Sequence, residues 1–115
     1  MTQRLTSALE EAVRQRQLAK QILEGLLFSS PSALTLEECA NPLREVGDAP
    51  LEWVVQLLKE LAEELALRNS ALEIAEIAGG YLLRTRAAIG PYLRKATSRR
   101  NQDKLSPSLL EVLIS

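Results

Sequence analysis

The strongest structural signal in this sequence is the spacing of apolar residues between residues 50 and 67. Apolar side chains recur there at intervals of three and four residues, the spacing that places them on one face of an α-helix. They are Leu51, Val54, Val55, Leu58, Leu61, Ala62 and Leu65. We therefore expect an amphipathic helix over this range, with its apolar face packed on a core.

Two short runs with a strand-like pattern follow this helix, at residues 72–77 and 81–85. Between them lies the pair Gly79-Gly80. Glycine tolerates the positive φ angles that a type I′ turn requires at both of its central positions. The pattern therefore predicts a β-hairpin with the two glycines at the centre of its turn.

The alternation of side chains predicts which face of this hairpin packs on the core. The residues expected on the core face are Tyr81, Leu83 and Thr85. In the first run the alternation slips between Ile74 and Ile77, which predicts a β-bulge. The side chains of Ile77 and Leu82 are then expected to point partly away from the core.

The N-terminal part of the chain contains two apolar stripes at helical spacing. The later stripe, within residues 18–28, predicts a core helix. The earlier one consists of Leu9, Ala12 and Val13. At 100° per residue the two stripes lie about 90° apart around a helix axis. We therefore interpret residues 1–17 as an N-terminal extension, with residues 6–16 either helical or frayed, and Ser7 and Glu10 as a capping box at the helix start.

Between these helices the sequence predicts a short strand and a short helix. Ala33-Leu34 can form the strand, and Thr35 with Glu38 matches a second capping box that opens the helix. Pro42 lies inside this helix, so we expect a kink or an early end there. Asp48 is expected to cap the next helix.

The resulting order is helix, short strand, helix, helix and hairpin. This order predicts a mostly helical α+β fold, a winged helix-turn-helix of three helices and a β-hairpin wing, over residues 18–95. Residues 87–95 are expected to add one or two helical turns. Residues 96–104 have the composition of a basic linker, and residues 105–115 predict a helix cut off just inside a second unit.

The formal net charge of −1 conceals an asymmetry along the chain. Residues 21–83 are acidic, whereas residues 84–104 carry seven basic residues and Asp103 as their only acid. Five basic residues are candidates for a nonspecific contact with DNA phosphates: Arg94, Lys95, Arg99, Arg100 and Lys104. The alternative is that they belong to a solvated linker. Outside its apolar stripe the helix over residues 50–67 is acidic and would repel DNA, so we do not expect it to contact bases.

The sequence offers little material for catalysis. It has no histidine, the usual general base near neutral pH, and a single cysteine, which excludes the common zinc-ligand spacings. The acidic pairs Glu37-Glu38 and Glu63-Glu64 are interpreted as solvated helix faces, and Cys39 as a small buried hydrophobe. We therefore expect a protein that is not an enzyme, with no cofactor, no metal and no small-molecule substrate.

Trp53 is the clearest candidate for a partner surface. On a helical wheel it lies about 130° from the centre of the apolar stripe of its helix, and Leu57 lies at the edge of that stripe. Either another part of the chain, such as residues 6–16, covers Trp53, or it anchors a partner. We predict that Trp53 and Leu57 contribute to self-association. Ile77 and Leu82 are a second, weaker candidate, since exposed strand edges pair with other chains.

Several segments also resemble a known family. They are QILEGLLF at residues 21–28, LTLEE at residues 34–38, IAGGY at residues 77–81 and, within residues 105–115, Leu-Ser followed by Leu-Glu and Leu. Their order and spacing resemble the N-terminal winged helix of the bacterial segregation and condensation protein B (ScpB) family, with the first helix of its second winged helix after it. The resemblance covers about residues 18–114.

The resemblance implies a non-catalytic subunit of the complex that an SMC ATPase and the kleisin ScpA form to organise and separate replicated chromosomes. It implies a homodimer formed through the N-terminal domain and a kleisin held largely by the second winged helix, most of which this sequence lacks. No apolar run is long enough to cross a membrane, and the N-terminus lacks the features of a signal peptide. We therefore expect a cytoplasmic, nucleoid-associated scaffold that binds DNA at most weakly and nonspecifically. The alternative is a winged-helix DNA-binding transcriptional regulator, which would need a basic recognition helix.

Overall fold

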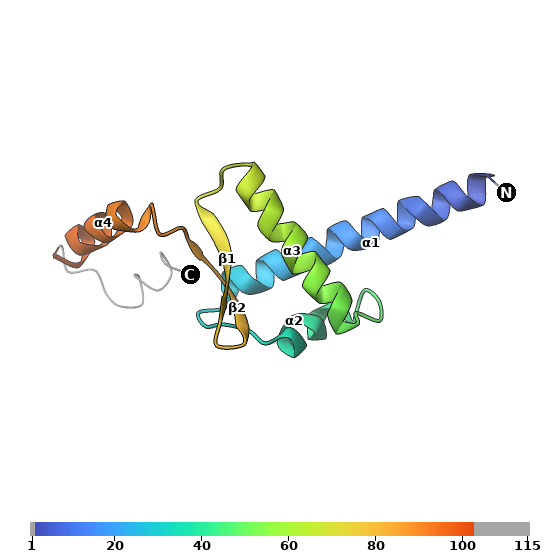
Figure 1. Ribbon diagram of the computed structural model, residues 1–115, viewed down its shortest axis with the longest axis horizontal. Helices are drawn as coiled ribbons and strands as arrows, with labels where there is room; N and C mark the ends of the chain where they lie inside the picture. The colour runs from blue at the N-terminus through green and yellow to red at the C-terminus, as the bar shows by residue number, and fades with distance from the viewer. Residues whose placement is uncertain (1, 103–115) are drawn as a thin grey trace.

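The computed structural model describes residues 2–102, which form four helices and a two-stranded antiparallel sheet (Figure 1). In chain order the elements are α1 (Thr2–Ser29), α2 (Leu36–Leu43), α3 (Leu51–Leu67), β1 (Leu72–Ile77), β2 (Gly80–Thr85) and α4 (Gly90–Gln102). The first three helices and the hairpin form a winged helix, so the predicted fold class is confirmed. The helix predicted within residues 105–115 lies outside the described residues.

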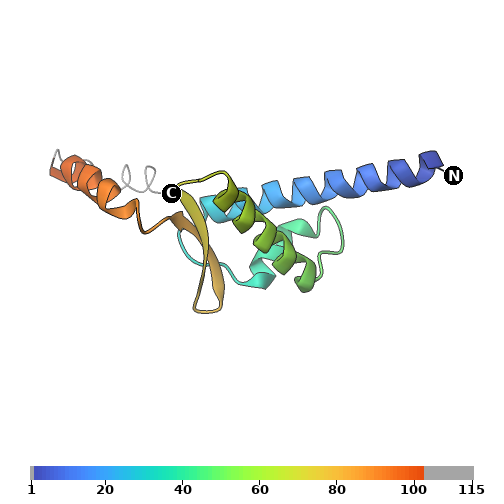
Figure 2. The same cartoon turned by 45° about the horizontal axis from the view of Figure 1, so that its top comes forward.

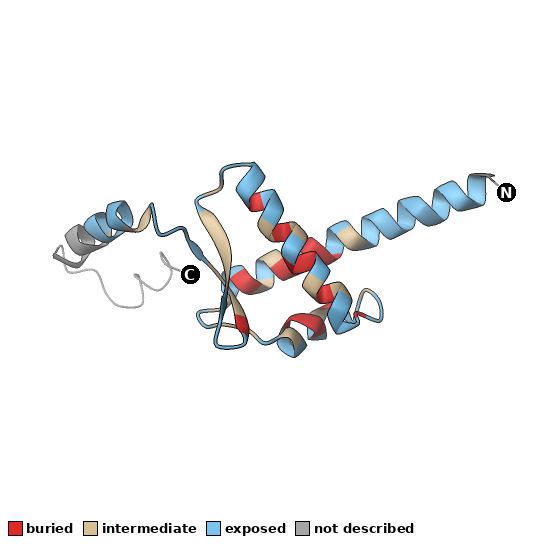
Figure 3. Ribbon diagram, in the orientation of Figure 1, coloured by how far each residue is buried: buried red, intermediate tan, exposed pale blue. Residues whose placement is uncertain are grey.

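The core lies where α1, α2 and α3 meet, and the hairpin packs on one side of it (Figures 1 and 3). The largest fully buried side chains all belong to the three helices. They are Leu23, Leu27, Cys39, Leu43, Val54, Leu57 and Leu65. The wing covers this cluster with half-buried Ile74, Tyr81 and Leu83. The core is therefore aliphatic, as the scarcity of aromatic residues requires.

A single helix of 28 residues forms α1, so residues 6–16 are helical and continuous with the core helix. The helix begins at Thr2, and Ser7 is not its start. The inner half of α1 (residues 16–29) packs on the body, whereas the outer half (residues 2–15) extends beyond it (Figures 1 and 2). From residue 3 to residue 15 every side chain is exposed (Figure 3).

The expected 90° offset between the two apolar stripes of α1 is wrong. Leu9 lies fourteen residues before Leu23, which is close to four helical turns, so both point to the same side of the helix. The prediction counted Leu18 with the core stripe, but that side chain is 47% exposed and lies off the packed face. The outer half therefore continues the face that the inner half packs on the body.

Local sequence signals around α2 are largely confirmed. The Thr35 hydroxyl accepts a hydrogen bond from the Glu38 N–H at 3.1 Å, and the Glu38 carboxylate accepts one from the Thr35 N–H at 3.1 Å. The helix ends one residue after Pro42, in agreement with the predicted early end. The expected cap at Asp48 is wrong, because Pro50 occupies the N-cap position of α3 and no side chain caps that helix.

The turn of the wing lies one residue earlier than predicted. Its central residues are Ala78 and Gly79, with φ angles of 50° and 79°, and Ile77 pairs with Gly80. Gly80 is buried in the sheet instead, where a Cβ atom would lie 3.0 Å from the Ala33 Cβ. Gly80 is thus required for close packing against Ala33, whereas Ala78 and Gly79 adopt the positive φ angles of the turn.

The pairing of β1 with β2 runs without interruption, so the predicted bulge is wrong. Ile74 lies opposite Leu83 and both pack on the core, whereas Thr85, expected on the core face, is exposed at the end of the ladder. The predicted short strand is present as a bridge between Leu34 and Tyr81, with backbone hydrogen bonds of 2.8 and 2.7 Å. This bridge ties the wing to the segment before α2.

The helix α4 is longer than expected. Residues 96–102, which have the composition of a linker, continue the helix that begins at Gly90. Pro91 suits the first turn of a helix, and no glycine or proline follows it before Gln102. The basic composition of this stretch is therefore carried on a helix over the part that the structure describes.

Candidate interaction surfaces

The structure separates the two residues of α3 that were predicted to mediate self-association. Leu57 is fully buried in the core, so its assignment to a partner surface is wrong. Trp53 is half-buried and packs against the same core from the first turns of α3. The cause is that both α1 and α2 pack on α3, which buries a wider arc of the helix than its apolar stripe indicated. Trp53 still presents apolar surface to solvent, and its role with a partner stays a prediction.

Ile77 and Leu82 lie on the outer face of the wing, away from the core. Ile77 is 39% exposed at the end of β1, and Leu82 is half-buried opposite Ala75. On the same face Arg84 pairs across the strands with Glu73 at 2.9 Å. The outer face is therefore apolar near the turn and charged near its base.

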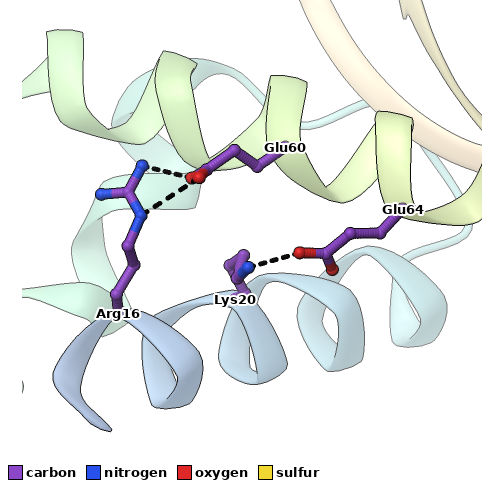
Figure 4. Close-up of polar contacts among 4 residues, drawn as sticks. All are labelled: Arg16, Lys20, Glu60 and Glu64. Carbon is purple, nitrogen blue, oxygen red and sulfur yellow. Dashed lines mark hydrogen bonds and ion pairs between the residues drawn. The ribbon is translucent and has the colours of Figure 1, made fainter. Parts of the chain in front are cut away.

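Ion pairs between α1 and α3 are a feature that the sequence did not predict (Figure 4). The pairs are Arg16–Glu60, Lys20–Glu64 and Glu24–Arg68. Each joins residues 44 positions apart, so the two helices run in the same direction along this contact. The Lys20 side chain is 8% exposed and hydrogen bonded to the Glu64 carboxylate, which offsets the cost of burying its charge.

These ion pairs change the electrostatic character expected of α3. From the sequence, all its acids were expected on a surface that repels polyanions. Glu60 and Glu64 instead face α1 and pair with its cations, which leaves Glu52 and Glu63 exposed beside Lys59. The solvated surface of α3 is therefore less acidic than the sequence alone indicated.

The candidate residues for DNA contact lie on α4 or beyond it. Arg94 and Lys95 are exposed on this helix, which extends from the body on the side opposite to the outer half of α1 (Figure 1). Arg99 and Arg100 belong to the same helix, and Lys104 lies outside the described residues. The structure thus places four of the five candidates on one projecting element.

Cys39 is a core residue, as its position on a predicted helix face indicated. It is fully buried, and this burial, together with the nearby Glu38 carboxylate, raises the pKa of its thiol to about 11. Such a thiol is a poor nucleophile near neutral pH. Within residues 2–102 the structure shows no group of three metal-ligating side chains. Over the same residues there is no helix with the length and apolarity to span a membrane.

The outer half of α1 presents the exposed apolar residues that sequence analysis missed. Leu5, Leu9 and Val13 are 66%, 66% and 58% exposed. Their spacing of four residues was visible in the sequence, but Leu9 and Val13 were assigned to an extension and Leu5 to no surface. Only the structure shows that the helix continues through them, with no neighbour among residues 2–102.

Together these elements define a winged-helix domain that leaves apolar residues exposed at its wing and along the outer half of α1. The family model of the segregation and condensation complex subunit ScpB matches residues 21–115. The chain therefore belongs to the ScpB family. The match begins inside the inner half of α1, so the outer half precedes it.

Individual relatives agree with this assignment. The chain is 36% identical over 94 residues to segregation and condensation protein B of Syntrophotalea carbinolica, covering 82% of this chain and 45% of the relative. It is 34% identical over 95 residues to the protein of the same name from Symbiobacterium thermophilum, covering 82% and 41%. The chain thus spans less than half the length of these curated relatives.

Solved structures of the family share the fold. ScpB from Mycobacterium tuberculosis superposes with a TM-score of 0.68 and 28% identity, covering 85% of this chain and 59% of that one. A dimer of the ScpB N-terminal domain complexed with a ScpA peptide gives a TM-score of 0.62 and 27% identity, covering 70% and 95%. Nearly all of that N-terminal domain therefore has a counterpart in this chain.

Proposed function

We propose that this chain is a non-catalytic scaffold subunit of an SMC–kleisin complex that condenses and segregates chromosomes. It forms a homodimer and binds the kleisin ScpA, through which it reaches the SMC ATPase. The observation that carries this proposal is the similarity to a ScpB N-terminal domain solved as a dimer with a ScpA peptide. This chain covers 95% of that N-terminal domain, so the comparison includes its winged helix.

We assign the contacts of the winged helix to its partly exposed apolar residues, Trp53, Ile77 and Leu82. Each is anchored in the fold and leaves apolar surface in water. A partner that covers this surface gains the free energy of removing it from solvent without a rearrangement of the core. Half-buried aromatic residues such as Trp53 are frequent anchors of protein interfaces.

The proposal excludes catalysis and places the protein at the nucleoid in the cytoplasm. The sequence has no histidine, and the raised pKa of Cys39 leaves its thiol inert at neutral pH. The family is named for chromosome segregation and condensation, a process that takes place on the nucleoid. We assign no membrane association and no small-molecule substrate.

Two measurements on the purified chain test the scaffold role. Multi-angle light scattering is expected to give the mass of a dimer, and labelled ScpA from the same organism is expected to bind saturably in fluorescence anisotropy. Trp53→Ala should weaken one of these contacts at least tenfold, whereas Glu52→Ala, at a neighbouring exposed position, should change neither. A monomeric chain that does not bind ScpA would overturn the proposal.

Nonspecific contact with DNA through α4 is a second candidate function. Residues 77–102 contain no acidic residue, and Arg94 and Lys95 are exposed within them. Such a segment contacts phosphates without reading sequence. Anisotropy of labelled duplex DNA should show weak binding at low salt that is lost at physiological salt. Tight, sequence-dependent binding at physiological salt would instead support the alternative of a winged-helix transcriptional regulator.

A further inference from the structure

We infer that the outer half of α1 pairs antiparallel with the same segment of a second copy of this chain, around Leu9. The inference rests on the homodimerisation proposed above and names a surface for it. The surface lies in residues 2–15, before the part of the chain that the family model matches. It is therefore a contact in addition to any made by the winged helix.

The outer half carries an apolar seam that has no neighbour within the described part of the chain. Leu5, Leu9 and Val13 form the seam, and each is more than half exposed. Fourteen residues later, on the same side of the helix, the corresponding residues are Ala19, Leu23 and Leu27. Those three are buried in the core. The seam thus repeats, two heptads earlier, the spacing by which α1 packs on the body.

The shape of the seam fits the side chain of a facing helix. Thr6, Leu9, Glu10 and Val13 line a shallow hollow, with Arg14 at its edge. The first four occupy positions i, i+3, i+4 and i+7, which form the hole that receives a knob from a partner helix in knobs-into-holes packing. The seam therefore offers a facing helix the kind of hole that knobs-into-holes packing uses.

The symmetry of the seam favours a second copy of the same helix. Leu5 and Val13 lie four residues on either side of Leu9. A two-fold axis at Leu9 brings Leu5 against the partner's Val13 and Leu9 against the partner's Leu9, so the surface is complementary to itself. The outer half is about 21 Å long at 1.5 Å per residue, and an antiparallel copy centred on Leu9 covers almost all of it.

The position of α3 selects the antiparallel direction. From Arg16 onward the seam is occupied, because Arg16 pairs with Glu60 and Lys20 with Glu64 of α3. A parallel copy would bring its own α3 into this occupied space. Figure 4 shows these two ion pairs between α1 and α3. An antiparallel copy would end where the free seam ends, which would put the two bodies at opposite ends of the helix pair.

The charge of the outer half argues for an apolar contact with protein. Its charged residues are Arg4, Glu10, Glu11 and Arg14, which sum to zero. Arg14 is moreover paired with Glu11 at 3.0 Å on the exposed side of the helix. Nucleic acids and anionic membranes are recognised by an excess of positive charge, which this segment lacks. Two copies of this segment carry no net charge, so no net repulsion opposes their approach.

A single cysteine at the symmetry axis tests the geometry. In Leu9→Cys the two introduced thiols meet in the antiparallel pair, and mild oxidation should convert most of the protein into a disulfide-linked dimer. Leu18→Cys is the matched control, because Leu18 is also exposed but lies nine residues away, on the opposite side of the helix. Cys39 is buried in both variants. Absence of a Leu9→Cys cross-link in a dimeric protein would overturn the inference.

A charge at the same position tests the energetics. Leu9→Glu brings two carboxylates together at the axis and should weaken the dimer at least tenfold in sedimentation equilibrium, whereas Leu18→Glu should leave its dissociation constant unchanged. Circular dichroism verifies that both variants remain helical. If wild type and Leu9→Glu are equally dimeric, this inference fails and the proposed homodimer stands. If wild type is monomeric at every concentration, both fail together, and binding of ScpA still tests the scaffold role separately.

Discussion

The two halves of α1 have similar apolar spacing but opposite exposure to solvent. Ala19, Leu23 and Leu27 of the inner half are buried, whereas Leu5, Leu9 and Val13 of the outer half are exposed (Figure 3). The two sets point to the same side of one continuous helix. The comparison shows that apolar periodicity determines which face of a helix can be buried, and that a neighbouring element decides whether it is.

The ion pairs of the two halves differ in the same way. Lys20 of the inner half is almost completely buried and pairs with Glu64 of another helix. In the outer half Arg14 pairs with Glu11 of its own helix, and both side chains are exposed. Exposed pairs contribute about 0–1 kcal/mol, whereas removal of the half-exposed Glu64 carboxylate leaves the almost completely buried Lys20 charge unpaired and costs more. Only the inner pair is expected to matter for stability.

Thiol reactivity gives the largest contrast between the halves. Cys39 lies in the core around the inner half, and its pKa of about 11 leaves roughly one thiol in a thousand ionised at pH 8, against about one in four for an ordinary cysteine. An aromatic disulfide reagent at low protein concentration should therefore modify the cysteine of Leu9→Cys at least a hundredfold faster than Cys39. The rate at Cys39 should rise with pH toward 11. Equal rates would show that the core opens as readily as the outer half.

Truncation of equivalent leucines tests burial directly. Leu23→Ala removes packed volume from the core and should lower the free energy of unfolding by about 3 kcal/mol. Leu9→Ala makes the same change four turns earlier and should lower it by less than about 0.5 kcal/mol in the monomer. Urea denaturation at low protein concentration measures both. Similar losses would mean that the outer half is covered within its own chain.

Removal of a carboxylate charge tests the ion pairs. Glu64→Gln leaves the nearly buried Lys20 ammonium without its counter-ion, and we expect a loss of about 1–2 kcal/mol. Glu11→Gln, in the exposed pair of the outer half, should cost less than about 0.5 kcal/mol. Both values come from denaturation curves at low salt. An effect of Glu11→Gln as large as that of Glu64→Gln would contradict the assigned difference between the pairs.

Helix propensity gives the smallest expected effect. Gly25 lies in the inner half with open space where a Cβ would stand, so Gly25→Ala should raise stability by about 0.5–1 kcal/mol. Ala8→Gly in the outer half changes propensity in the opposite direction by about 1 kcal/mol. It should lower the helical signal in circular dichroism without moving the urea midpoint, because residues 3–15 are all exposed and do not pack on the core. A shifted midpoint would show that the outer half is coupled to the core.

Much of the fold follows from local signals. The capping box of Thr35 and Glu38, the early end at Pro42 and the apolar face of α3 each depend on residues within a few positions of one another, and all three are present. Several of the errors concern the wing. Gly80 was assigned to the turn, but the bridge between Leu34 and Tyr81 requires a residue without a side chain beside it. That requirement comes from residues 33–34, which lie far from Gly80 in the sequence, so the pattern of neighbouring residues does not predict it.

The candidate surfaces were less predictable than the fold. Leu57 was assigned to an interface because it lies at the edge of the α3 stripe, yet α1 and α2 together bury it. The exposure of Ile77 agrees with expectation, and Arg94 and Lys95 lie within the helical turns expected over residues 87–95. That this helix projects from the body (Figure 1) was not expected. The seam around Leu9 was missed because Leu9 and Val13 were interpreted as part of an extension that is either helical or frayed, and Leu5 was assigned to no surface. Exposure depends on which elements meet, and that information is not local.

The sequence by itself determined the three core helices, the hairpin, their order and the family, because each depends on periodicity, caps or short motifs along the chain. The tertiary structure alone decided that Glu60 and Glu64 face α1 and that the seam around Leu9 has no neighbour within the described residues. The reason is physical. A residue's chemistry sets the free energy that burial or pairing can release, but the release occurs only where another element comes within contact distance.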